Sequence, residues 1–291
     1  MSRYTALKLS RSILLAAILA VAGFVSSANA ANPSLVSIST PRGAKQPFIL
    51  INPGQPVAAV ILFAGGHGAL GLSSAVKMKW GANNFLVRTR NMLAARRLMV
   101  AVVDAPSDKP RGMNAIFRMS PAHAADIGAV AAYLKQQEDV PVWLVGTSMG
   151  TFSAANGAMA AKHVDGLVLT STITRARPKW KIASSHKDGV ASMPLQKITV
   201  PTLIVSHKND GCNITPAGDA SLLLARLERA AMKKITLVEG GLPARSGPCK
   251  AKSAHGFLGV EDKAIDSIAD SIRAHAQLNA GARTQTGPEK K

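Results

Sequence analysis

The sequence predicts an α/β protein with a mostly parallel, doubly wound sheet and helices on both of its faces. Short apolar runs of strand length alternate with longer stretches of helix length over most of the chain. Several of the short runs are apolar at nearly every position, which is typical of parallel strands that are buried on both faces. With 291 residues, the chain is long enough for one such domain or for two small ones at most.

The expected strands follow one another through the whole chain. The first two suggest a leading antiparallel hairpin, and the later ones alternate with helices, as a parallel sheet requires. The expected strands are 35–40, 48–51, 57–63, 98–103, 141–147, 166–170, 202–206 and 235–239.

The expected helices lie between these strands. Ser120 and Pro121 mark the clearest start, because serine is a preferred N-cap and proline suits the first helical turn. The polar segment 280–291 after the last helix is expected to be disordered. The expected helices are 83–97, 121–137, 153–161, 216–232 and 261–277.

Residues 1–30 have the three regions of a secretory signal peptide: a basic start, the apolar run 13–25 and a small-residue end. Cleavage is expected after Ala30, which leaves a periplasmic or secreted domain at 31–279. The alternative is an uncleaved membrane anchor, but thirteen apolar residues are too few to span a bilayer comfortably. No later stretch is long and apolar enough to span, so no stable membrane anchor is expected after cleavage.

The formal charge of +19 points to anionic partners. Removing the basic residues of the predicted signal peptide lowers it to +16. The remaining basic residues are scattered, aromatic residues make up only 4%, and no DNA-binding motif is present, which argues against nucleic-acid binding. Weak contact with anionic polymers of the cell envelope fits better. The three basic residues removed are Arg3, Lys8 and Arg11.

One motif points to chemistry. The serine of Gly146-Thr147-Ser148-Met149-Gly150 directly follows a predicted strand and precedes a predicted helix. A strand, a sharp turn and a helix, with glycines two residues on either side of the serine, form the setting of a nucleophile elbow. The backbone N–H groups at the helix start can then face a developing oxyanion.

Further reactive residues follow other predicted strands, at the edge where they gather in a doubly wound sheet. Asp210 follows one strand, His255 follows the last strand after a loop, and Gly65-Gly66-His67-Gly68 follows the first buried one. A histidine can accept the proton of a serine hydroxyl, and a carboxylate can fix the tautomer of that histidine.

The chain order serine, aspartate, histidine resembles that of the α/β-hydrolases over residues 57–277. The resemblance implies Ser148 as nucleophile, Asp210 as acid and His255 as base. It implies no metal and no organic cofactor. The segment 172–200, where this family inserts its lid, is short and basic, which implies a short lid or none.

The resemblance also implies an oxyanion hole. The N–H of Met149, directly after the nucleophile, is one expected donor. The other is expected in the turn that contains Gly66 and His67, which is similar but not identical to the His-Gly patterns of esterases and lipases.

Other residues could fill these roles. Asp104 also ends a predicted strand and is the main alternative to Asp210, although this family does not normally place the acid there. His207 and His67 are alternative bases, and His186 could contact a substrate. The glycine-rich turn lacks the Gly-Lys-Ser/Thr of a phosphate loop. Three histidines are expected at the surface: His123, His163 and His275.

The chain has two cysteines, Cys212 and Cys249, and both lie in the mature part. An oxidising compartment allows them a single pairing. The expected disulfide would join the loop of Asp210 to the loop of His255.

Together these features predict an exported serine hydrolase that cleaves carboxylic esters by acyl transfer to water. Its substrate is expected to be a small ester or amide. Two alternatives stay open: a peptidase or amidase with the same three residues, and a non-catalytic protein of the same fold that binds an envelope component.

Overall fold

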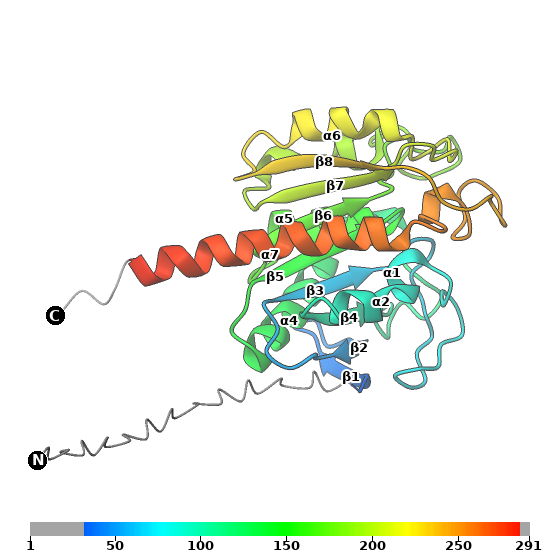
Figure 1. The fold of residues 1–291 in the computed structure, drawn as a ribbon. Coiled ribbons are helices and arrows are strands. Elements are labelled where there is room, and N and C mark those ends of the chain that lie inside the picture. Colours follow the sequence, from blue (N-terminus) through cyan, green and yellow to red (C-terminus); the bar gives the residue numbers. More distant parts are fainter. Residues whose placement is uncertain (1–31, 286–291) are drawn as a thin grey trace, which may run out of the picture.

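The computed structural model describes residues 32–285, which form an eight-stranded sheet with helices on both faces (Figure 1). The strand order is β1-β2-β4-β3-β5-β6-β7-β8. β1, β2 and β4 pair antiparallel, and every pairing from β4 to β8 is parallel. The predicted fold class is confirmed. The strands are β1 Ser34–Ser39, β2 Lys45–Ile51, β3 Ala58–Phe63, β4 Leu98–Val103, β5 Val142–Thr147, β6 Gly166–Thr170, β7 Thr202–His207 and β8 Lys233–Val238.

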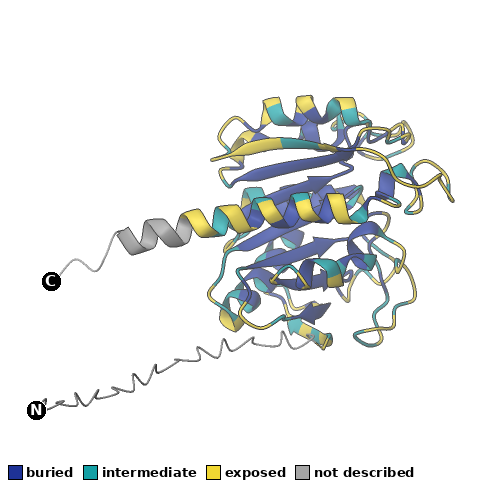
Figure 2. Cartoon of the chain, in the orientation of Figure 1, coloured by how far each residue is buried: buried dark blue, intermediate teal, exposed yellow. Residues whose placement is uncertain are grey.

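The central strands are apolar throughout because each of their two faces packs against a layer of helices. In β3, Ile61 and Phe63 belong to one hydrophobic core, while Val60 and Leu62 belong to the other. Burying a side chain of this size contributes about 1.5–3 kcal/mol, so these strands stabilise both layers. Figure 2 shows the central strands buried and the edge strand β8 largely exposed.

The helices divide between the two faces. α1, α2 and α7 cover one face, and α3, α4, α5 and α6 pack into the core of the other (Figure 1). The helices are α1 Phe85–Arg88, α2 Arg90–Ala94, α3 Ala115–Arg118, α4 Pro121–Gln137, α5 Gly150–Ala160, α6 Ala220–Arg226 and α7 Glu261–Gln285.

Several helix boundaries differ from those predicted. The single helix expected at 83–97 is two short helices, because the Thr89 hydroxyl donates to the Phe85 carbonyl at 2.7 Å and the backbone turns there. The helix expected at 216–232 contains α6 and a short 3-10 turn and ends at Arg226, where Leu227 leaves the helix to enter the core.

The last helix, α7, continues to Gln285, past the predicted end at Gln277. The segment predicted to be disordered at 280–291 is therefore helical as far as Gln285. Its remainder lies outside the described residues, as does the predicted signal peptide at 1–30. Between residues 32 and 285, no helix is long and apolar enough to cross a membrane.

The prediction that His123 lies at the surface is wrong. This histidine is buried in the first turn of α4, with its ring near the rings of Phe63 and Phe117. Burial and, to a smaller extent, the charges of Arg118 and Arg42 lower the pKa of His123 to about 3, so the ring is neutral at physiological pH. His163 is exposed, as expected, and His275 is half-buried beside Trp143.

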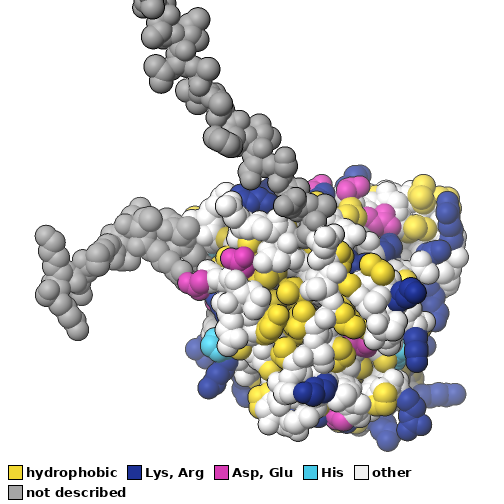
Figure 3. Space-filling model, turned by 90° about the horizontal axis from the view of Figure 1, so that it is seen from below, with side chains coloured by type: hydrophobic (Ala, Val, Ile, Leu, Met, Phe, Trp, Pro, Cys, Tyr) yellow, Lys and Arg dark blue, Asp and Glu magenta, His cyan; other side chains and the backbone are white. Residues whose placement is uncertain are grey.

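The positive charge is spread over the surface. Seen from below in Figure 3, lysine and arginine side chains lie mainly towards the rim, while hydrophobic side chains gather nearer the centre. On this face the basic residues do not form one continuous patch, in keeping with their scatter along the sequence.

Candidate active site

Ser148 lies at the turn between β5 and α5, in a conformation that side chains rarely adopt. Its φ is +52°, in the left-handed region that costs a non-glycine residue about 1–2 kcal/mol. The Ser148 N–H donates to the Thr170 carbonyl at 3.1 Å, and the Ser148 carbonyl accepts from the Thr151 N–H at 3.0 Å. Strand β6 and the first turn of α5 therefore hold the serine in this conformation.

The two glycines of the serine motif are required by close packing. A Cβ atom at Gly150 would overlap the carbonyl oxygen of Phe63, and one at Gly146 would lie 2.6 Å from the carbonyl oxygen of Gly150. Helix α5 can start directly against β3 only because both side chains are absent. These contacts give the physical reason for the spacing of the motif.

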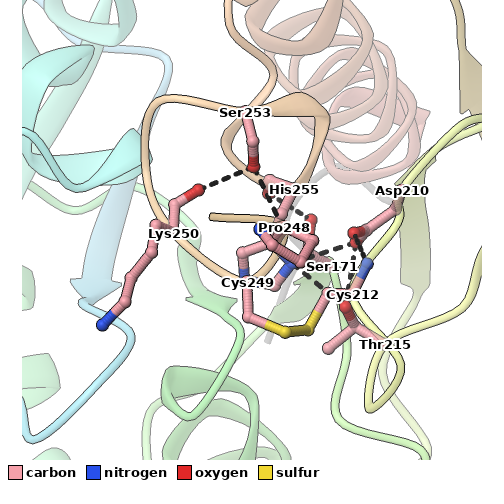
Figure 4. The surroundings of a disulfide bond; sticks show 9 residues. All are labelled: Ser171, Asp210, Cys212, Thr215, Pro248, Cys249, Lys250, Ser253 and His255. Atoms are coloured by element: carbon pink, nitrogen blue, oxygen red, sulfur yellow. Dashed lines mark hydrogen bonds and ion pairs between the residues drawn. A yellow bond between two sulfur atoms is a disulfide. The ribbon is translucent and has the colours of Figure 1, made fainter. Parts of the chain in front are cut away.

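Asp210 and His255 form a buried pair beyond the ends of β7 and β8 (Figure 4). His255 Nδ1 lies 3.0 Å from Asp210 Oδ2, and the side chains are 6% and 0% exposed. The other carboxylate oxygen accepts the Cys212 N–H at 2.9 Å. A carboxylate beside Nδ1 favours the tautomer that leaves Nε2 free to accept a proton.

Two hydroxyl groups orient this pair, and the sequence had not indicated either. Thr215 Oγ1 donates to Asp210 Oδ2 at 2.9 Å and lies 3.0 Å from His255 Nδ1. Ser171 Oγ donates to the His255 carbonyl at 2.8 Å. The histidine is therefore fixed at both its ring and its backbone.

The predicted disulfide between Cys212 and Cys249 is present (Figure 4). It connects the loop that follows Asp210 to the loop that precedes His255. Within the second loop, Ser253 Oγ donates to the carbonyls of Pro248 and Lys250 at 3.1 and 2.9 Å. The bond therefore joins two segments that are themselves ordered by hydrogen bonds.

Ser148 and His255 line the same cavity, whose volume is about 490 Å³. Its walls come from the glycine-rich turn after β3, from the segment 78–85 and from the loop 249–256. Within the described chain the Ser148 hydroxyl makes no hydrogen bond to His255. Catalytic hydrogen bonds are often long in free enzymes and shorten when substrate binds.

In the glycine-rich turn, Gly65 is the residue that packs against the serine. A Cβ at Gly65 would lie 3.0 Å from Ser148 Cβ. Gly65 and Gly66 line the cavity, whereas the His67 ring lies against the Trp80 ring, with 3.9 Å between centroids and an interplanar angle of 37°. Among the described residues, the N–H groups of Gly65, Gly66 and Met149 have no hydrogen-bond partner, so each can donate to a ligand.

Arg118, which the sequence had not indicated, supports this turn from inside the protein. It is fully buried, and burial lowers its pKa to about 10, so it stays protonated at neutral pH. Its guanidinium donates to Ser153 Oγ at 2.8 Å and to the carbonyls of Ala64 and Gly66 at 3.4 and 3.3 Å. The Ala64 carbonyl belongs to the same peptide unit as the Gly65 N–H, so the arginine both orients and polarises that donor.

Asn84 is a further residue of the cavity wall that sequence reasoning missed. Its Nδ2 lies 3.4 Å from the position that a Cβ at Gly65 would occupy. Its Oδ1 is buried without a hydrogen-bond partner. Nothing in its local sequence distinguishes it from other helix-start asparagines.

The alternative site residues have other partners. Asp104 accepts the backbone N–H groups of Leu70, Leu72 and Ala105 and so holds the loop after the glycine-rich turn. His207 Nε2 lies 3.0 Å from the Gly240 carbonyl. The His186 ring is beside the Ser185 hydroxyl. None of these three side chains lines the cavity.

The fold is similar to those of several solved hydrolases. A Pyrococcus furiosus esterase matches with a TM-score of 0.56 and 14% identity over 82% of this chain and 91% of its own. A Rhizomucor miehei esterase matches with a TM-score of 0.61 and 14% identity over 89% and 87%. A Xanthomonas campestris α/β serine hydrolase without a lid matches with a TM-score of 0.52 and 13% identity over 85% and 94%.

This chain has the α/β-hydrolase fold. No protein-family model and no curated protein matches its sequence. The segment between β6 and β7, where a lid was considered, forms the short 3-10 helices η1 Gly189–Ser192 and η2 Leu195–Lys197. Ile182, Val190 and Leu195 pack into the core from this segment, and it contributes no residue to the cavity wall.

Proposed function

We propose that the protein is an exported serine hydrolase that cleaves carboxylic esters. One observation supports this above all: Ser148, in a left-handed elbow, and His255, hydrogen-bonded to the buried Asp210, line one cavity beside unpartnered backbone N–H groups. The similarity to solved esterases supports the reaction class.

In the proposed reaction, His255 Nε2 takes the proton of the Ser148 hydroxyl while Oγ attacks the ester carbonyl. The N–H groups of Met149 and of Gly65 or Gly66 stabilise the oxyanion. His255 then gives the proton to the departing alcohol, which leaves an acyl-serine. Water, deprotonated by His255, attacks that acyl group and releases the acid, and the proton returns to Ser148.

A fluorophosphonate probe tests the nucleophile. We expect it to label the purified mature protein and the Ser184→Ala variant, because Ser184 is an exposed serine that does not line the cavity. It should not label Ser148→Ala. Equal labelling of Ser148→Ala would contradict the proposal.

A substrate panel tests the bond that is cleaved. Short-chain nitrophenyl esters should be hydrolysed faster than aminoacyl anilides, and Ser148→Ala should abolish turnover. Faster cleavage of the anilides would favour an amidase or peptidase. No labelling and no turnover of either class would favour a non-catalytic protein.

The proposed export rests on the signal-peptide pattern of residues 1–30 and on the disulfide, which an oxidising compartment favours. Intact-mass analysis of the native protein should show Ala31 as the first residue. A mass that includes residues 1–30 would contradict cleavage.

A further inference from the structure

The charged side chains of the cavity wall share one sign. Apart from His255, the charged residues that line it are Lys79 and Lys250, and no aspartate or glutamate of the described chain is among its lining residues. Lys79 comes from the segment between β3 and α1, and Lys250 comes from the loop between β8 and α7. Two lysines from separate segments therefore belong to the wall of the cavity that Ser148 also lines.

Hydrogen bonds fix the backbone of both lysines. The Lys79 N–H donates to the carbonyls of Leu70 and Gly71 at 2.9 and 3.2 Å, and its side-chain stem lies against Gly71, where a Cβ would be 3.0–3.2 Å from its carbons. The Lys250 N–H donates to the Gly247 carbonyl at 2.9 Å, next to the disulfide. Figure 4 shows the Lys250 side chain extended away from the disulfide and from the Asp210–His255 pair.

Neither ammonium group has a carboxylate partner within residues 32–278. Most other lysines of the described chain also lack one; the exceptions include Lys135, which pairs with Asp165 at 2.9 Å, and Lys208, which pairs with Glu239 at 2.9 Å. Lys79 and Lys250 differ from the other lysines because they line the cavity of Ser148. Two uncompensated positive charges at one concave site create a positive potential there. A lysine is a compact charge on a flexible stem, so it can follow an anion whose position varies between substrates.

We propose that the site selects esters that carry an anionic group, such as a carboxylate, a few atoms from the reacting carbonyl. This inference rests on the proposed esterase function and specifies its substrate class. Lys79 and Lys250 would bind the anionic group while the carbonyl lies at Ser148. Both lysines are exposed to solvent, so each should change kcat/KM for such an ester by only about two- to fivefold at low salt.

Two pairs of esters test the proposal, because the members of each pair differ by one charge. Nitrophenyl hemiglutarate and its methyl ester place the difference on the acyl side. Acetoxybenzoate and its methyl ester place it on the alcohol side. The proteins to compare are the wild type, Lys79→Met, Lys250→Met, the double variant and Lys162→Met, an exposed lysine beyond the far end of α5.

We expect the wild type to prefer the anionic ester in at least one pair, and that pair shows on which side the anion binds. Lys79→Met, Lys250→Met and added salt should reduce this preference, because they lower kcat/KM for the anionic ester more than for the neutral ester. Lys162→Met should retain it. If Lys162→Met reduced the preference for the anionic ester to the same extent, the preference would come from general attraction of the anion to the basic surface. That result would overturn the proposal.

If the wild type showed no preference for the anionic ester in either pair, the proposed substrate class would also be overturned. Turnover of the neutral ester then shows whether the esterase proposal has failed as well. If the neutral ester is cleaved in a Ser148-dependent reaction, the esterase function stands and only the anionic substrate class is wrong. If no ester is cleaved and the fluorophosphonate does not label Ser148, both are wrong.

Discussion

The two halves of the candidate site are held in place by different means. The serine half, with Ser148 and Gly65, lies at the ends of central strands and is braced from inside by the buried Arg118. The acid–base half has Asp210 in the loop after β7 and His255 in the 3-10 helix η4 Ala254–Gly256, and it is braced by a disulfide and by hydroxyl groups.

The difference follows from the surroundings of each half. Near the central strands, backbone carbonyls are already buried, so a buried guanidinium can satisfy several of them at once. Beyond the ends of β7 and β8, a covalent bond is added to the packing of Cys212, Ile214 and Phe257. We therefore expect the acid–base half to be damaged without loss of the fold, and damage to the serine half to lower stability as well.

After loss of the nucleophile, the largest effect is expected from the carboxylate that faces the histidine. Asp210→Asn should lower kcat about ten-thousandfold, because the amide no longer favours the tautomer that leaves Nε2 basic. Asp104→Asn is the matched control: it should lower the free energy of unfolding and retain most of the activity, because Asp104 accepts backbone N–H groups away from the cavity. Steady-state kinetics would measure kcat of both variants, and urea unfolding would measure their free energies of unfolding. Greater loss of kcat in Asp104→Asn would reverse the assignment of the acid.

A smaller effect is expected from Arg118→Met. Without the guanidinium, the Ala64 and Gly66 carbonyls lose their donor and the Gly65 N–H is less well aimed, so kcat should fall about tenfold with little change in KM. The midpoint of urea unfolding should fall too. Ser153→Ala removes only the contact to α5 and should have the smaller effect on kcat. A loss of stability with unchanged kcat would mean that Arg118 supports the core alone.

The same contrast explains what the sequence could predict. Ser148 was predicted as the nucleophile because strand, glycines and helix are adjacent in the chain, and the fold class, which the structure confirms, was predicted because the apolar runs are local patterns. Asp210 and His255 were reached through chain order, and the disulfide through the presence of two cysteines. Each of these predictions needed only residue types and their positions along the sequence.

The features that were missed depend on contacts that residue types along the sequence do not specify. Arg118 is separated from Ala64 by 54 residues and bonds to backbone carbonyls, which are the same at every position. The burial of His123 depends on how α4 packs beneath β3, and the break at Thr89 depends on one hydroxyl. No local pattern distinguishes these from a surface arginine, a surface histidine or an uninterrupted helix.

A moderate effect is expected from reduction of the disulfide. In the loop-entropy model, a bond across 37 residues contributes about 3–4 kcal/mol to the free energy of unfolding. The sheet core retains its strands without it, so dithiothreitol at moderate temperature should lower turnover and leave far-UV circular dichroism nearly unchanged. Cys212→Ser/Cys249→Ser should behave like the reduced protein. Joint loss of activity and ellipticity would show that the bond supports the whole fold.

The smallest effect at neutral pH is expected from His123, which is buried beside Phe63 and Phe117. Its folded pKa of about 3 is below the usual 6.5, because burial and the nearby arginines disfavour the charged ring. Between these values the unfolded chain binds the extra proton, so the free energy of unfolding should fall by about 1.4 kcal/mol per pH unit as the pH is lowered below 6.5. His123→Leu removes this contribution and retains an apolar side chain between Phe63 and Phe117. Urea unfolding at pH values from neutral to acid should therefore give a shallower slope for the variant, and identical slopes would show that His123 is protonated in the folded protein.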